Sequence, residues 1–249
     1  MQAEVRRLAD RGYKEVVLTG IHLSSYGADF PGQTENLLSL IQTVHQVEGI
    51  TRIRLGSLEP RVITEEFVQS LKALPKVCPH FHLSLQSGCQ ETLRRMNRRY
   101  TAQEYFEKCE LLRKYYGNPA LTTDVIVGFP QESPEDFVES YDFVERVRFY
   151  ETHIFKFSRR KGTRADKMDG QIPEPEKTRR SERLLELGDR RAREYEEGFL
   201  GKCLEVLLEE EITVGRTSLS WWGTPGSTSR RRFWPVDIRS TTAFNWCPG

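Results

Sequence analysis

Short apolar runs that end in small or polar residues alternate with amphipathic segments through the first two thirds of the chain. In the amphipathic segments the apolar residues recur at helical spacing, which predicts helices that each bury one face. Strands that alternate with helices imply a parallel sheet with right-handed crossovers, so we expect an α/β fold that begins with a helix. The predicted strands lie within residues 15–20, 51–60, 79–88, 121–130 and 151–163, and the predicted helices within 2–11, 36–47, 65–74, 102–116 and 133–147.

Residues that commonly begin helices precede three of these segments. Thr64, Thr101 and Ser133 each stand where a side-chain oxygen can accept a backbone N–H of the first turn. Pro134 occupies the first helical position after Ser133, and acidic residues follow it, as the helix dipole favours. These caps predict where the three helices begin.

The last third of the chain has a different character. Residues 1–165 are expected to form the core, and residues 166–200 a linker and a charged helix. Residues 201–211 include CLEVLLEE, a candidate strand. Residues 212–249 hold all four tryptophans, contain neither Lys nor Glu, and show no periodicity. We assign no element to this tail, which fits an unstructured or out-of-frame terminus better than an aromatic and arginine surface for single-stranded nucleic acid.

The composition narrows the class of protein. Of the 249 residues 37% are apolar, which is enough for a sizeable core, and no run is long and apolar enough to cross a membrane. Lys and Arg (37) nearly balance Asp and Glu (36), so any binding of nucleic acid depends on local basic patches. The five cysteines form no CxxC or CxxxCxxC, which predicts free thiols and no metal site. We expect a cytoplasmic location and no membrane contact.

Polar residues follow the ends of all five predicted strands. Because the carboxyl ends of parallel strands meet at one edge of a sheet, we expect these residues to surround a ligand pocket. Each of them has an alternative role as a helix cap or turn former. Gly20, Gly88 and Gly128 would let a cofactor approach bare backbone. The predicted ring comprises Thr19, Ser57, Glu59, Gln86, Ser87, Asp124 and Ser158.

The histidines give little support to a hydrolase. His22, His80, His82 and His153 lie near predicted strands, but none belongs to a nucleophile or metalloprotease motif. His82 alternates with Phe81 and Leu83, which favours a hydrogen-bonded histidine inside a barrel over a catalytic one.

Two basic clusters follow candidate site strands. They suit an anionic substrate at the mouth of the pocket, and the alternative is a solvated helix face and a solvated loop. The first cluster is Arg94, Arg95, Arg98 and Arg99, and the second is Arg159, Arg160, Lys161 and Arg164.

Six strings in order resemble the methylthiotransferase family of radical S-adenosylmethionine enzymes over about residues 2–211. The strings are KEVVLTGIHLSSYG, RIRLGSLEP, KVCPHFHLSLQSGC, LRRMNRRYT, LTTDVIVGFPQESPEDF and FSRRKGTRA. LGSLEP together with GIHLSSYG looks most similar to the branch that methylthiolates N6-threonylcarbamoyladenosine, at the tRNA position 3′ to the anticodon.

The resemblance implies a partial (β/α)6 TIM-like barrel, S-adenosylmethionine, two [4Fe-4S] clusters and a tRNA partner. Arg94 to Arg99 and the loop from Ser158 to Thr163 would face the tRNA. The cofactor wall implied by the matching motifs comprises Thr19, Gly20, Ser57, Glu59, Gln86, Ser87, Gly88, Asp124, Gly128, Phe129 and Pro130.

The chain also departs from the family's pattern. It contains no CxxxCxxC, so we expect a barrel without its first strand, without the cluster ligands, and without activity on its own. Residues 201–211 are expected to begin a small β-barrel of the TRAM type. Three alternatives remain open: another branch of the methylthiotransferase family, a non-catalytic RNA-binding module, and a metabolic α/β-barrel enzyme acting on a phosphorylated substrate.

Overall fold

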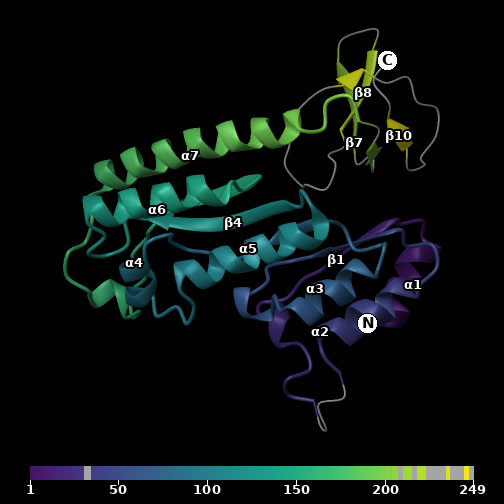
Figure 1. Cartoon of the computed structure of the whole chain (residues 1–249), viewed down its shortest axis with the longest axis horizontal. Coiled ribbons are helices and arrows are strands. Elements are labelled where there is room, and N and C mark those ends of the chain that lie inside the picture. Colours follow the sequence, from purple (N-terminus) through teal and green to yellow (C-terminus); the bar gives the residue numbers. More distant parts are fainter. Residues whose placement is uncertain are drawn as a thin grey trace. The chain divides into compact units, whose positions relative to one another are not determined.

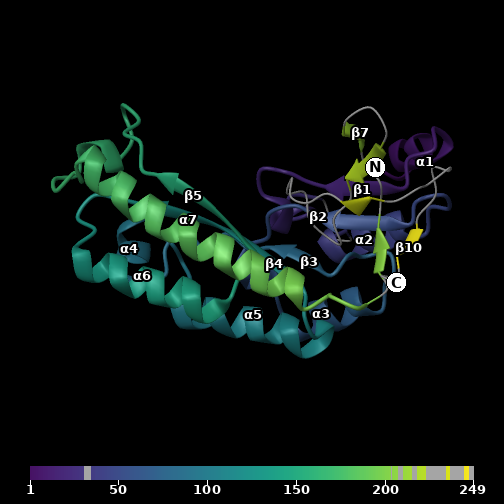
Figure 2. The same ribbon diagram turned by 90° about the horizontal axis from the view of Figure 1, so that it is seen from above.

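The computed structural model of the chain (Figure 1) contains five parallel strands that follow one another in sequence order (Figure 2). Backbone pairing joins the first two strands and, separately, the last three, and bridges from Ile53 to Val77 and from Leu58 to Leu83 connect the two groups. The chain therefore forms one winding series, as the alternating pattern predicted. The strands are β1 (Glu15–Leu18), β2 (Arg52–Leu55), β3 (His80–His82), β4 (Ala120–Val127) and β5 (Glu151–Lys156).

Helices connect these strands, and Figure 2 shows α5 and α6 along one side of β3 to β5. The charged helix predicted within residues 166–200 is α7, which begins at Glu174. The helices are α1 (Gln2–Asp10), α2 (Leu37–His45), α3 (Glu65–Lys72), α4 (Gln90–Arg95), α5 (Ala102–Tyr116), α6 (Pro134–Val147) and α7 (Glu174–Glu197). Single 3-10 turns lie at η1 (Leu23–Ser25), η3 (Pro60–Val62) and η4 (Ala165–Lys167).

The three predicted caps are confirmed. The Thr64 hydroxyl accepts the Phe67 N–H at the start of α3. Thr101 and Ser133 form capping boxes at the starts of α5 and α6, in which cap and third residue satisfy each other's backbone N–H. The polar residues therefore mark these helix starts through local hydrogen bonds alone.

The two faces of the sheet differ in chemistry. Val16, Leu18, Ile53 and Leu55 point to the helix layer and are buried, whereas Val17 between them is 52% exposed on the other face. Successive residues of a strand point to opposite faces, so the helix-free face carries the alternate residues of each strand. Charged and polar side chains are concentrated on that face.

The structure describes residues 1–30, 35–202, 204–206, 210–214, 218–222, 234–235 and 244–246. It divides into one compact unit from Met1 to Arg193 and a second from Glu194 to Gly249. Within the described residues, no helix is both long and apolar enough to cross a membrane.

The second unit contains short antiparallel strands. The candidate strand at 201–211 is divided between β6 (Leu204–Val206) and β7 (Glu210–Val214), with residues 207–209 outside the described part. The tail, for which the sequence predicted no element, contains β8 (Ser218–Trp222), β9 (Trp234–Pro235) and β10 (Phe244–Trp246), pairing β7–β8–β9 and β6–β10. These pairings join distant segments, which a search for local periodicity does not detect. A TRAM-type barrel is not supported, and the rest of the tail lies outside the described residues.

Close packing at Gly88 gives a stability prediction. A Cβ atom there would lie 2.5 Å from Cβ of Phe143 and 2.9 Å from the carbonyl oxygen of Ser140, both in α6. We expect Gly88→Ala to lower the free energy of unfolding by about 1–3 kcal/mol, because a packed helix would have to shift. Chemical denaturation measures this loss.

Gly20→Ala is the matched control, since its Cβ would meet no atom closer than 3.8 Å. The control is expected to change stability by no more than about 0.5 kcal/mol. Equal unfolding midpoints for the two variants would contradict the packing argument.

Candidate functional site

The ends of β1 and β2 present polar residues to solvent. Thr19, Ser57 and Glu59 are exposed, and the backbone N–H of Gly56 donates to the Leu18 carbonyl at 2.8 Å, which places the two strand ends side by side. The Ser24 hydroxyl accepts the Glu59 N–H at 3.0 Å. The backbone of Glu59 is therefore held in place, and its exposed carboxylate, 3.9 Å from His22 Nδ1, can reach a ligand.

Gln86 lies on the next strand end in an unusual backbone conformation. Its φ of +74° is in the left-handed region, and its backbone pairs with β4 through the Asp124 carbonyl and the Ile126 N–H, both at 2.8 Å. This pairing makes Gln86 the register partner of Val125. Asp124 lies within β4 and not beyond its end, where the ring hypothesis expected it. The left-handed conformation of a non-glycine residue costs free energy, and residues strained in this way are common at ligand-binding sites.

Ser87 and Gly88 turn away from the strand-end surface. Both are buried, and the Ser140 hydroxyl of α6 accepts the Gly88 N–H at 2.9 Å. The Ser87 hydroxyl lies 3.5 Å from the same Ser140 oxygen and accepts the Cys89 N–H. The small size of Gly88 allows the close approach of α6, and its role as bare backbone for a cofactor stays a prediction.

The loop after β4 is fixed by a buried carboxylate. The backbone N–H groups of Gly128 and Phe129 both donate to the Glu132 carboxylate. Gly128 has a φ of +71°, and a Cβ there would lie 2.3 Å from the Lys177 side chain of α7. The loop that includes Gly128, Phe129 and Pro130 is buried, so its shape is set by internal contacts.

Helix α7 supplies the countercharge to that carboxylate. Arg180 and Glu132 are each 3% exposed, with 3.4 Å between Nη1 and Oε1. Arg180 also donates to the Glu132 carbonyl at 2.9 Å and to Glu176 at 2.7 Å. Burial raises the pKa of Glu132, and the Arg180 charge opposes that rise. Neither residue was among the predicted site residues, and the only local signal in the sequence is an acid shortly after the Gly-Phe-Pro turn.

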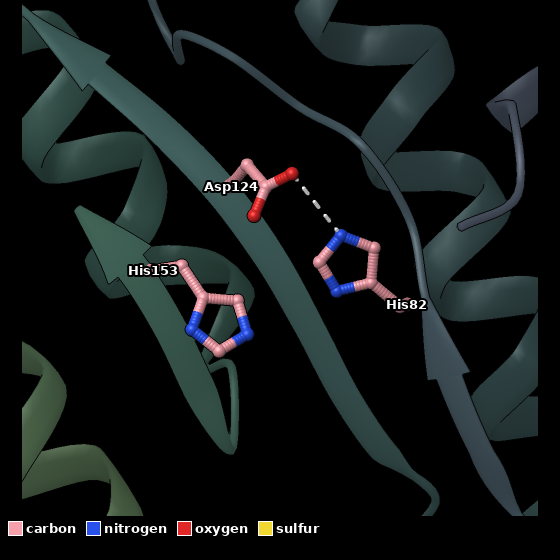
Figure 3. Close-up of side chains that lie close together, drawn as sticks. All are labelled: His82, Asp124 and His153. Carbon is pink, nitrogen blue, oxygen red and sulfur yellow. Dashed lines mark ion pairs between the residues drawn. The ribbon is translucent and has the colours of Figure 1, made fainter. Parts of the chain in front are cut away.

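His82, Asp124 and His153 come together on the helix-free face of the sheet, one from each of β3, β4 and β5 (Figure 3). His82 Nε2 lies 3.4 Å from an Asp124 oxygen, and His82 Nδ1 lies 3.0 Å from the Thr122 hydroxyl. The His82 and His153 rings stack with centroids 5.7 Å apart. The expectation that His82 is a hydrogen-bonded barrel histidine is confirmed.

The charge state of this cluster follows from its surroundings. Burial tends to raise the pKa of Asp124, but the hydrogen bond and charge of His82 outweigh it and lower that pKa below its usual value. His80, one position along the same face, has its pKa lowered to about 4, chiefly by burial and then by the Arg54 charge. Asp124 is therefore an anion at neutral pH, and His80 is neutral.

The predicted basic clusters divide into exposed and internal residues. Arg95 is tied to the Asp136 carboxylate and the Thr92 hydroxyl, and its side chain is only 15% exposed. It therefore holds α4 to α6 and is unsuited to binding a polyanion. Arg94 pairs with Glu91, and Arg159 pairs with Asp166. The exposed residues outside these pairs are Arg98, Arg99, Arg160, Lys161 and Arg164.

The described cysteines do not fit an iron–sulfur cluster. Cys78, Cys89 and Cys109 are buried free thiols. Burial raises the pKa of Cys89 to about 11 and that of Cys109 to about 12, so both are protonated at neutral pH. Clusters are held by thiolates, and these side chains do not offer them.

The sequence model of the Radical SAM superfamily matches residues 1–144. Two solved structures share the fold. Coproporphyrinogen III oxidase from Escherichia coli has a TM-score of 0.55 and 16% identity, covering 78% of this chain and 44% of that chain. A radical S-adenosylmethionine methyltransferase from Kitasatospora setae has a TM-score of 0.51 and 20% identity, covering 64% of this chain and 30% of that chain. The chain belongs to the Radical SAM superfamily, whose enzymes use S-adenosylmethionine and a [4Fe-4S] cluster.

Curated relatives narrow the resemblance further. A tRNA-2-methylthio-N(6)-dimethylallyladenosine synthase from Acetivibrio thermocellus is 40% identical over 86% of this chain and 46% of its own length. A threonylcarbamoyladenosine tRNA methylthiotransferase from Bacillus subtilis is 41% identical over 83% of this chain and 46% of its own length. The chain is thus similar to tRNA methylthiotransferases, as its motifs indicated, and spans about half the length of these relatives.

The ion pair between Arg180 and Glu132 is expected to dominate the stability of the loop after β4. Arg180→Leu leaves a buried carboxylate without its countercharge, which costs about 3–5 kcal/mol. Urea unfolding, monitored by circular dichroism, measures the loss.

Arg179→Leu is the matched control. Arg179 also pairs with Glu176, but its side chain is 54% exposed, so we expect a change of no more than about 1 kcal/mol. If Arg180→Leu is no less stable than this control, Glu132 does not depend on Arg180.

Proposed function

We propose that this chain is the barrel portion of a tRNA methylthiotransferase that acts on N6-threonylcarbamoyladenosine, 3′ to the anticodon. The observation that carries the proposal is the 40% and 41% identity to curated tRNA methylthiotransferases over more than four fifths of the chain. These relatives include enzymes named for the threonylcarbamoyl and for the dimethylallyl nucleoside. LGSLEP and GIHLSSYG support the threonylcarbamoyl branch.

The contribution of these residues is a binding wall for S-adenosylmethionine. The exposed strand ends fit the group: Glu59 offers a carboxylate to ribose hydroxyls or an ammonium, and Thr19 and Ser57 offer hydroxyls beside it. When bound to a cluster, S-adenosylmethionine supplies radical chemistry. We assign no radical step to this chain, because the cysteines among the described residues do not fit a cluster. That the 249 residues alone are inactive stays a prediction.

Binding of S-adenosylmethionine tests the proposed wall. Isothermal titration calorimetry of the full chain, in EDTA to exclude metal effects, is expected to show saturable binding that Glu59→Gln weakens about tenfold. The physical reason is the loss of charged hydrogen bonds, each worth roughly 1.5–3 kcal/mol.

Glu66→Gln is the matched control, an exposed acid on α3 whose replacement is expected to leave binding unchanged. Equal affinities for the two variants would remove Glu59 from the wall. If S-adenosylmethionine does not bind while tRNA does, the non-catalytic RNA-binding module is the better reading.

Recognition of tRNA is assigned to the exposed basic residues. Arg98 and Arg99 follow α4, directly after the strand end at Gln86. Arg160 and Lys161 follow β5 in the same way. Basic side chains of this kind bind phosphates and hold an RNA in register, whereas selection of the modified base requires contacts inside the barrel.

Arg98→Ala/Arg99→Ala is expected to weaken binding of a tRNA anticodon stem-loop and to reduce the salt dependence of its affinity by about one unit of slope for each lost phosphate contact. Fluorescence anisotropy over a salt series measures both. The matched control is Arg6→Ala/Arg7→Ala, an exposed arginine pair on α1. An equal loss in the control would indicate nonspecific attraction.

The same assay distinguishes the nucleosides. A stem-loop with N6-threonylcarbamoyladenosine is expected to bind more tightly than one with dimethylallyladenosine or unmodified adenosine. The opposite order would assign the chain to the dimethylallyl branch without contradicting the wall for S-adenosylmethionine.

A further inference from the structure

His82, Asp124 and His153 place one ligand atom each within 4.8 Å of one another on the helix-free face of the sheet. Two imidazoles and one carboxylate form a common donor set for divalent transition metals. We propose that these three side chains form a mononuclear site for such an ion, with Zn²⁺, Co²⁺ and Fe²⁺ as candidates. This site shares Asp124 with the predicted cofactor wall, adds two histidines that the wall does not include, and uses no cysteine.

Backbone pairing brings the three ligands together. His82 is the register partner of Thr122 in β4, and Asp124 is the register partner of His153 in β5. Since alternate residues of a strand share a face, the side chains of Thr122 and Asp124 point to the same side as both histidines. Three adjacent strands of one sheet therefore supply the ligands, and strand positions are more rigid than loop positions.

His82 uses Nδ1 for a hydrogen bond within the sheet, so its Nε2 is the nitrogen that would bind a metal ion. Nδ1 lies 3.0 Å from the Thr122 hydroxyl, to which a neutral imidazole can donate its N–H. Nε2, 3.4 Å from an Asp124 oxygen, donates a proton to that carboxylate when no metal is bound. A metal ion would displace this proton and bind the Nε2 lone pair. Histidine ligands in metal sites usually donate their second nitrogen to an oxygen in this way, which fixes the ring and the tautomer.

The exposure of His153 makes the proposed site accessible from solvent. His153 is exposed, and no side chain of the described residues hydrogen-bonds its imidazole. Figure 3 shows the His153 and His82 rings on either flank of β4, on the same face of the sheet as Asp124. Small side-chain rotations would shorten the separations to those of ligands around one ion, whose bonds are about 2.0–2.2 Å long. Water or an oxygen of a bound ligand would complete the coordination.

Cobalt titration tests the site. The full chain, without an affinity tag and stripped with EDTA, is titrated with Co²⁺ in the absence of S-adenosylmethionine and tRNA, and the d–d absorption bands report the ligands. We expect one ion per chain, displaced by Zn²⁺, and no thiolate-to-cobalt charge-transfer band. His153→Ala and Asp124→Asn should each weaken binding by more than about tenfold, and Thr122→Val by roughly 10- to 100-fold.

His22→Ala is the matched control, since His22 is an exposed histidine 3.9 Å from the Glu59 carboxylate and remote from the cluster in sequence. Its affinity for Co²⁺ should stay within about twofold of the unaltered chain. Thermal unfolding of every variant without metal checks the fold. Absence of Co²⁺ binding, a thiolate band, or equal losses in His22→Ala and His153→Ala would each overturn the site. None of these outcomes bears on binding of S-adenosylmethionine, which is measured in EDTA.

Discussion

Parallel pairing of β1 to β5 in sequence order is the constraint on which the rest of the structure depends. Each crossover returns on the same side of the sheet, so helices cover one face and the other face stays available for polar side chains. Glu15 shows the consequence, because it accepts hydrogen bonds from both Arg52 and Arg54 on the helix-free face. The chemistry of the molecule is therefore gathered on one side of a single sheet.

The strand-end loops differ in how they are held. The ends of β1 and β2 are exposed and suit contact with a ligand, whereas the loop after β4 is locked by Glu132 and Arg180. Because a buried charge without a partner is costly, this pair ties the loop to α7, a helix beyond the segment that the superfamily model matches. Helix α7 is thus part of the support of the proposed cofactor wall.

The arginines of the first unit have two distinct structural settings. Arg95 and Arg180 belong to buried or half-buried pairs that hold elements together. Arg98 and Arg99 are exposed, which suits their proposed contact with a polyanion. The sequence alone does not show which arginine in a run is buried and which is exposed, because this depends on which acidic side chain each arginine meets in the fold.

The sequence by itself determined the order and type of elements in the first unit, and Thr64, Thr101 and Ser133 marked helix starts because caps act within one turn. It also placed Thr19 and Ser57 at neighbouring strand ends, whereas Asp124 lies within β4. Only the tertiary structure decided that His153 meets Asp124, that Gly88 faces Phe143, and that Arg180 neutralises Glu132. Such pairs join residues of different elements through sheet register and helix packing, which local spacing does not encode.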